Sequence, residues 1–140
     1  MKVTLDRLND AYHFEAKGAS GIPVLIDNKT GDVVQGASPM ELLLMGVGGC
    51  SAIDIIMILK KQRQEITAYH VEVEGARHEV ALAKPFEAIH TKIYLEGDIA
   101  ADKAKRAARL SFDKYCSVSM TLQAGVKITY AIILNGKELD

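Results

Sequence analysis

The sequence has few of the features that usually reveal a biochemical function. Only two cysteines occur, Cys50 and Cys116, and their wide separation along the chain excludes a CxxC redox pair and a metal-binding knuckle. The four histidines show no HxxxH or other paired-ligand spacing, so we expect surface histidines and no metal site. No cofactor is expected either.

An excess of charge of one sign is also lacking. The 17 basic and 18 acidic side chains give a formal net charge of −1. The chain therefore has no electrostatic reason to bind nucleic acid or an anionic membrane. Basic residues gather within residues 103–114, where we expect a solvated helix face. Alternatively, Arg106 or Arg109 could reach a cysteine and act as its cation.

No internal repeat, low-complexity tract or Pro/Gly-rich linker interrupts the sequence, so residues 1–140 are predicted to form one domain. Met1–Arg7 alternates polar and apolar residues, which is typical of a strand and not of a signal peptide, and we expect a cytoplasmic location. The apolar run Leu42–Leu59 is long enough for a membrane span. Its glycines and the acidic Asp54 favour a buried core helix instead.

Hydrophobic periodicity predicts an α+β fold in the order βββ-α-ββ-αα-β, with long antiparallel strands packed on two helices. A second helix is expected from Asp102, with an apolar face that runs from Ala100 to Tyr115. The predicted strands centre on residues 3–5, 12–16, 24–26, 69–74, 89–95 and 126–134.

A capping box predicts where the first helix begins. Ser38 is the N-cap, Pro39 takes the first helical position, and Glu41 follows three residues after the cap. The helix should continue to about Gln62. Because it is apolar on almost every side, a second copy of the chain should cover it, which predicts an intertwined homodimer.

The two thiols suggest redox chemistry. A thiolate that attacks a peroxide becomes a sulfenic acid, and a second thiol within reach condenses with it to a disulfide. This requires the Cα atoms of Cys50 and Cys116 to lie within about 7 Å. The alternative is a structural Cys50, packed as a small apolar residue where Gly46, Gly48 and Gly49 permit close helix packing.

Two acids are candidates for the same site. Asp54 lies four residues after Cys50 on the same helical face, where an ionised carboxylate would raise the thiol pKa. It could instead anchor a cation, cap a polar network or have no catalytic part. Glu41 is either the capping-box acid alone or a catalytic acid as well.

The segment SPMELLLMGVGGCS at residues 38–51, the later YCSVS at 115–119 and the element order resemble the OsmC/Ohr family of peroxide-stress proteins. GGCSAID is similar to the YhfA-like branch of that family. The resemblance covers about residues 1 to 135. It implies an OsmC-like fold, in which antiparallel sheets wrap around long central helices of an intertwined homodimer with active sites at the subunit interface.

The resemblance further implies thiol-dependent reduction of organic hydroperoxides in an oxidative stress response. Cys50 would be the peroxidatic thiol and Cys116 the resolving thiol, and a dithiol such as a lipoyl protein would reduce the disulfide. The peroxidase branches have Glu directly after the helix-start proline, whereas this chain has Met40 there and Glu41 next. The loop Lys17–Pro23 also lacks the arginine of those branches.

Two other functions remain open. The displaced acid and the missing arginine favour a non-catalytic dimeric module that binds a small hydrophobic, lipid-like or sulfur-containing ligand. A thiol redox protein that acts on another electrophile, such as a disulfide or a persulfide, would use the same cysteines. The retained cysteine pair favours the peroxidase.

Overall fold

The computed structural model describes residues 1–140, which form two compact units. The N-terminal unit comprises residues 1–43 and the C-terminal unit residues 44–140. The order of elements confirms the predicted α+β class, and the formation of one domain by the whole chain stays a prediction.

The N-terminal unit holds a three-stranded antiparallel sheet of β1 (Thr4–Arg7), β2 (Phe14–Lys17) and β3 (Pro23–Ile26), as predicted. In the turn before β2, the Asn9 side chain accepts hydrogen bonds from two backbone N–H groups. One of them belongs to His13, which is only 9% exposed. The prediction of a surface histidine was wrong here, because this turn folds the residue inward.

Helix α1 (Pro39–Lys61) begins with the predicted capping box and ends one residue before the predicted limit. The Glu41 N–H donates to Ser38 Oγ at 3.3 Å, and Glu41 Oε2 accepts from the Ser38 N–H at 2.8 Å. Lys29 Nζ lies 2.7 Å from Glu41 Oε1. The Lys29 contact first, and then the hydrogen bonds from Ser38, lower the pKa of Glu41 to about 2.

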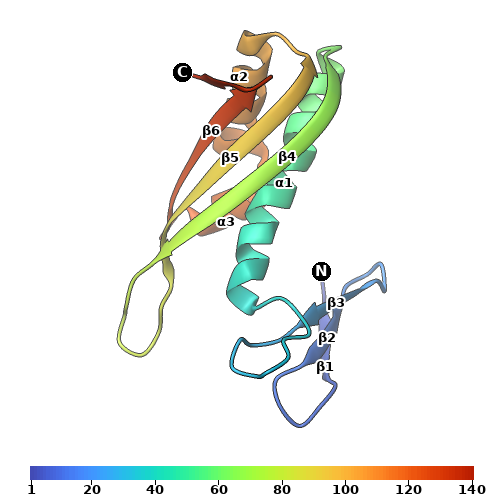
Figure 1. The fold of residues 1–140 in the computed structure, drawn as a ribbon, viewed down its shortest axis with the longest axis vertical. Helices are drawn as coiled ribbons and strands as arrows, with labels where there is room; N and C mark the ends of the chain where they lie inside the picture. Colours follow the sequence, from blue (N-terminus) through green and yellow to red (C-terminus); the bar gives the residue numbers. More distant parts are fainter. The chain divides into compact units, whose positions relative to one another are not determined.

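The C-terminal unit contains a four-stranded sheet in the order β4-β5-β6-β7 (Figure 1). The long strands β4 (Glu65–Arg77) and β5 (Phe86–Asp98) pair antiparallel, as predicted. Strand β6 (Lys127–Leu134) pairs parallel to β5, so the prediction of antiparallel strands throughout was wrong. The added strand β7 (Lys137–Leu139) was not predicted.

The connection between β5 and β6 explains the parallel pair. It passes through α2 (Ala101–Leu110), the π-helical turn η1 (Ser111–Tyr115) and α3 (Ser117–Leu122). Such a helical crossover returns the chain to the end of the sheet from which β5 began, so the next strand runs in the same direction.

Strand β7 follows from a local signal. Asn135 and Gly136 both have positive φ, 50° and 80°, and form the two-residue turn between β6 and β7. Asn-Gly is the preferred sequence for such a turn, because these residues tolerate positive φ at low cost. The Asn-Gly dipeptide could therefore have predicted this hairpin from the sequence.

Helices α1 and α2 lie on the same face of this sheet (Figure 1). By length and composition α1 could cross a membrane, but here it is a partly buried core helix, with Val47 and Ile55 fully buried. Its exposed side carries residues four positions apart, which we call the apolar stripe. The apolar stripe consists of Met45, Gly49, Ile53 and Met57.

The predicted apolar face of the second helix is confirmed only in part. Ala104, Ala107, Ala108 and Ser111 are buried, as the spacing predicted. Ala100 is exposed because it precedes the helix as its N-cap residue, and Tyr115 is 47% exposed, which corrects the prediction at both ends of the face. The exposure of Tyr115 follows from η1, since a π-helical turn takes up more residues than an α-turn and changes the direction in which the later side chains point.

The low pKa of Glu41 can be tested by NMR titration of its carboxyl group. We expect about 2 in the wild type and a value closer to the ordinary 4.5 in Lys29→Met. Because the folded-state pKa is depressed, this contact stabilises the fold above pH 4.5 and the contribution is lost as the pH falls toward 2. Lys84→Met removes the partner of Glu79 and serves as the matched control; an unchanged Glu41 pKa in Lys29→Met would contradict the assignment.

Close packing of α1 on β4 predicts different outcomes for two glycines. A Cβ at Gly48 would lie 2.9 Å from Val73 Cγ2, whereas one at Gly46 would lie 3.5 Å from Val118 Cγ1. Both substitutions by alanine gain about 1 kcal/mol of helix propensity. Only Gly48→Ala also overpacks the interface, which costs about 1–3 kcal/mol. Urea denaturation should therefore find Gly48→Ala less stable than Gly46→Ala, and the reverse order would exclude this packing.

Candidate functional site

The fold brings Cys50, Asp54 and Cys116 together. One ligand-type atom of each, the two Sγ atoms and a carboxylate oxygen, lie within 4.8 Å of one another. Both cysteines are free thiols. The sequence-based requirement that two distant cysteines become neighbours is therefore met.

Helix α1 supplies two of these groups. Cys50 and Asp54 are one turn apart on a row beside the apolar stripe, and both are half-buried. This row faces α3, since a Cβ at Gly46, one turn before Cys50, would lie 3.5 Å from Val118 Cγ1, whereas Gly48 lies on the other side of the helix, against Val73 of β4. The structural alternative of close helix packing therefore holds only in part: Gly46 faces a helix, Gly48 faces a strand, and Gly49 has no neighbouring atom within 4 Å.

Cys116 lies between η1 and α3 and is fully buried. Its N–H donates to the Ser111 carbonyl at 2.8 Å, which closes η1. Its Sγ accepts from the Ser119 N–H at 3.4 Å and from the Ser119 hydroxyl at 3.1 Å. Cys116 is thus the N-cap of α3, with sulfur where an oxygen is usual.

Ser119 is a site residue that the sequence reasoning missed. A signal was present, because a cap residue bonds the backbone N–H two or three positions later, and Ser119 follows Cys116 by three. What the spacing could not reveal is the second hydrogen bond, from the hydroxyl to Sγ.

The environment holds Cys116 in its thiol form. Burial raises its pKa above the ordinary value, the hydrogen bonds from Ser119 lower it, and the neighbouring Cys50 raises it again, with a net increase. No basic group contributes to this shift. Asp54 is held by Ser111, whose hydroxyl donates to Oδ2 at 3.3 Å, so the carboxylate is part of a polar network around the thiols.

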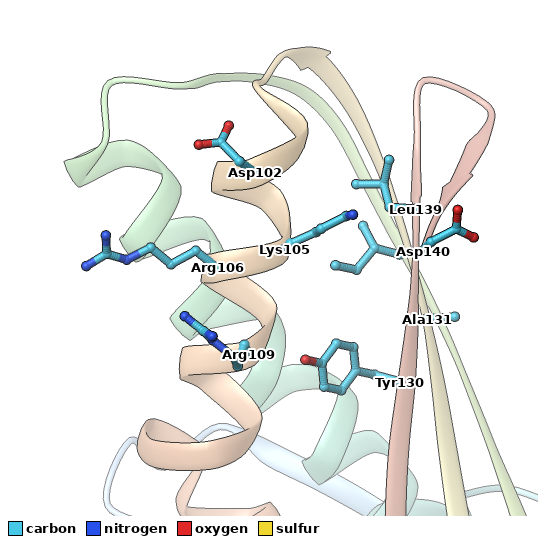
Figure 2. A pocket seen from close by; sticks show the side chains of 9 residues that line it. Asp102, Lys105, Arg106, Arg109, Tyr130, Ala131, Leu139 and Asp140 are labelled. Carbon is cyan, nitrogen blue, oxygen red and sulfur yellow. The ribbon is translucent and has the colours of Figure 1, made fainter.

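The cations considered from the sequence lie on the solvent side of α2. Arg106 and Arg109 are exposed, and both border a groove of about 520 Å³ between α2 and β6. Figure 2 shows Lys105 extending across this groove toward Leu139 and Asp140. The exposed arginines thus agree with the solvated helix face expected for this segment.

Glu41 belongs to the N-terminal unit, where Ser38 and Lys29 occupy its carboxylate. This is the structural role that the capping box predicted. A catalytic part for Glu41 stays a prediction.

Comparison with known proteins decides the family. Residues 29–131 match the model of the family described as OsmC-like protein. The chain belongs to the OsmC-like family. This confirms the resemblance found in the sequence, and it accounts for two sheets with a long central helix.

Individual proteins resemble this chain in sequence or in fold. Protein YhfA of Escherichia coli K12 is 40% identical over 119 residues, which cover 84% of this chain and 87% of YhfA. The crystal structure of a hypothetical protein from Aquifex aeolicus VF5 is 32% identical, with a TM-score of 0.80 and 96% of each chain covered. The organic hydroperoxide resistance protein OhrB of Bacillus subtilis shares the fold, with a TM-score of 0.64, 19% identity, and 94% and 96% of the two chains covered.

The two thiols should differ in reactivity. In the reduced native protein we expect iodoacetamide to modify half-exposed Cys50 before Cys116, because Cys116 is buried and its pKa is raised. Ser119→Ala should slow Cys116 further by removing a hydrogen bond that lowers its pKa, whereas Ser117→Ala should not. Peptide mass mapping over time gives the rates, and equal modification of both cysteines from the start would refute the difference.

Proposed function

We propose that this protein is a cytoplasmic, homodimeric, thiol-dependent peroxidase that reduces organic hydroperoxides. The observation that carries the proposal is the partly exposed Cys50 beside the buried Cys116, with the two Sγ atoms within 4.8 Å of each other. An accessible thiol can meet a peroxide, and a sheltered neighbour can complete the reaction. Membership of a family that includes a hydroperoxide resistance protein supports the same chemistry.

The proposed reaction has two steps. The Cys50 thiolate attacks the distal oxygen of the hydroperoxide, the O–O bond breaks, and the alkoxide takes a proton to leave as the alcohol. The resulting Cys50 sulfenic acid is then attacked by Cys116, which forms the disulfide and releases water. A dithiol, such as a lipoyl group, returns both cysteines to thiols and is itself oxidised to a disulfide.

The apolar stripe supports both the dimer and the substrate class. It runs along α1 next to the row that carries Cys50, and Ile53 on it is 69% exposed. A second copy of the chain packed on the stripe would remove this surface from water, as in an intertwined dimer. The same apolar surroundings would favour hydroperoxides with a hydrocarbon portion.

Glu41 is kept as the third candidate residue of the reaction. With a pKa of about 2 it is ionised at neutral pH. It could therefore hold a cation or orient a donor, but it could not act as a proton donor.

A binding module is the second candidate, and one observation favours it. The acidic Asp54 lies beside the thiols, and no basic group contributes to the pKa of Cys116. A carboxylate opposes thiolate formation. If the partner subunit supplies no cation, the stripe would serve as a ligand surface without catalysis.

Oxidation by cumene hydroperoxide separates the two candidates. We expect the reduced wild type to lose both thiols at one equivalent of oxidant, with a Cys50–Cys116 crosslink found by peptide mass mapping. Cys116→Ala should instead accumulate sulfenic or overoxidised Cys50, because no resolving thiol remains. Cys50→Ser should lose the rapid reaction, and Ser117→Ala is the matched control that should keep it. Slow oxidation of the wild type without a specific crosslink would rule out the peroxidase and favour the binding module.

A further inference from the structure

The thiol site contains more than a redox reaction needs. Two thiols and a carboxylate converge from two separate parts of the chain, with all three donor atoms within 4.8 Å. Asp54 adds a carboxylate beside the two thiols. This carboxylate would act as a ligand if a cation were bound between the three groups.

We propose that Cys50, Cys116 and Asp54 form a binding site for Zn²⁺ in the reduced protein. Two thiolates and one carboxylate suit Zn²⁺, with bonds of about 2.3 Å to sulfur and about 2.0–2.2 Å to oxygen. Two sulfurs on one tetrahedral zinc are about 3.8 Å apart. The observed spacing therefore needs a contraction of about 1 Å at most, which side-chain rotation can provide.

Two of the ligands are arranged as helical metal ligands usually are. Cys50 and Asp54 are four residues apart on α1, the spacing at which side chains on one helix face bind a common metal. The third ligand, Cys116, comes from the junction of η1 and α3. A ligand pair from one helix with a third group from another segment would lock the two segments together.

Neighbouring side chains orient these ligands. The Ser111 hydroxyl donates to Asp54 Oδ2, which leaves the other carboxylate oxygen free for the metal. Both the N–H and the hydroxyl of Ser119 donate to Cys116 Sγ, which fixes the direction of the sulfur. Hydrogen bonds of this kind hold metal ligands in place and strengthen binding.

The donor set selects the class of metal. Thiolates are poor ligands for Mg²⁺ and Ca²⁺, which prefer oxygen, whereas Zn²⁺ accepts sulfur and oxygen together. An iron–sulfur cluster commonly needs four thiolates, and the chain has two cysteines. Three protein ligands leave a fourth position for water, and half-buried Cys50 and Asp54 give the ion a route from solvent.

Zinc binding and peroxide reduction would exclude each other. Binding exchanges the two thiol protons for one Zn²⁺. Oxidation of the zinc-bound thiolates by a hydroperoxide joins the two sulfurs in a disulfide, takes two protons from water to yield the alcohol and water, and removes two of the three ligands, so the ion leaves. The site would then release Zn²⁺ on oxidation, which goes beyond the proposed peroxidase and does not depend on its rate.

Competition with a chromophoric zinc chelator tests the proposal on the reduced, metal-free full chain. We expect one Zn²⁺ per chain. Cys50→Ser and Cys116→Ser should abolish binding, and Asp54→Asn should weaken it about tenfold or more. Asp113→Asn, an exposed acid three residues before Cys116, is the matched control and should bind as the wild type does. Co²⁺ in place of Zn²⁺ should give sulfur-to-metal charge-transfer absorption that is lost in the cysteine variants.

Any of three results would overturn the proposal: the protein takes up no zinc in competition with the chelator, it still binds zinc after loss of both cysteines, or Asp54→Asn and Asp113→Asn bind zinc with equal affinity. If Cys116→Ser fails to fold by circular dichroism, the disulfide form of the wild type replaces it and must not bind Zn²⁺. If the protein binds zinc but does not react rapidly with cumene hydroperoxide, the zinc site is supported and the peroxidase is rejected. If it reacts rapidly but binds no zinc, the peroxidase is supported and the zinc site is rejected.

Discussion

The packing of α1 against the segment that carries η1 and α3 is the constraint on which the thiol site depends. A Cβ at Gly46, one turn before Cys50, would lie 3.5 Å from Val118 Cγ1 of α3, and Asp54 accepts a hydrogen bond from Ser111 of η1. From that position Cys50 and Asp54 face the junction of η1 and α3. The hydrogen bond from the Cys116 N–H to the Ser111 carbonyl then holds the second thiol against the first.

The two cysteines are chemically unequal because their surroundings differ. Cys50 is half-exposed beside the apolar stripe, whereas Cys116 is fully buried, with its pKa raised chiefly by burial. One thiol is thus partly accessible to solvent and the other is not. The same arrangement places two sulfurs and a carboxylate together, so the proposed redox chemistry and the proposed zinc binding would use the same atoms.

Family membership accounts for the fold, while the chemistry depends on particular side chains. The chain has the Cys50–Cys116 pair, and the Glu41 carboxylate is engaged by Lys29 and Ser38. Asp54 adds a negative charge beside the thiols. The reactivity of Cys50 therefore depends on the charges of the groups around it.

The sequence alone determined the α+β class, the alternating strands and the start of α1 at its capping box, and it pointed to Cys50 and Cys116 as candidate site residues, because these depend on local periodicity and on motifs. Only the tertiary structure decided the parallel pairing of β6, the exposure of Tyr115, the burial of His13 and the hydrogen bonds from Ser119 to Cys116. Periodicity reports which face of an element is buried. It does not report which strand lies alongside, where a π-turn shifts the helical phase, or which distant side chains meet, since those depend on packing between segments far apart in the chain.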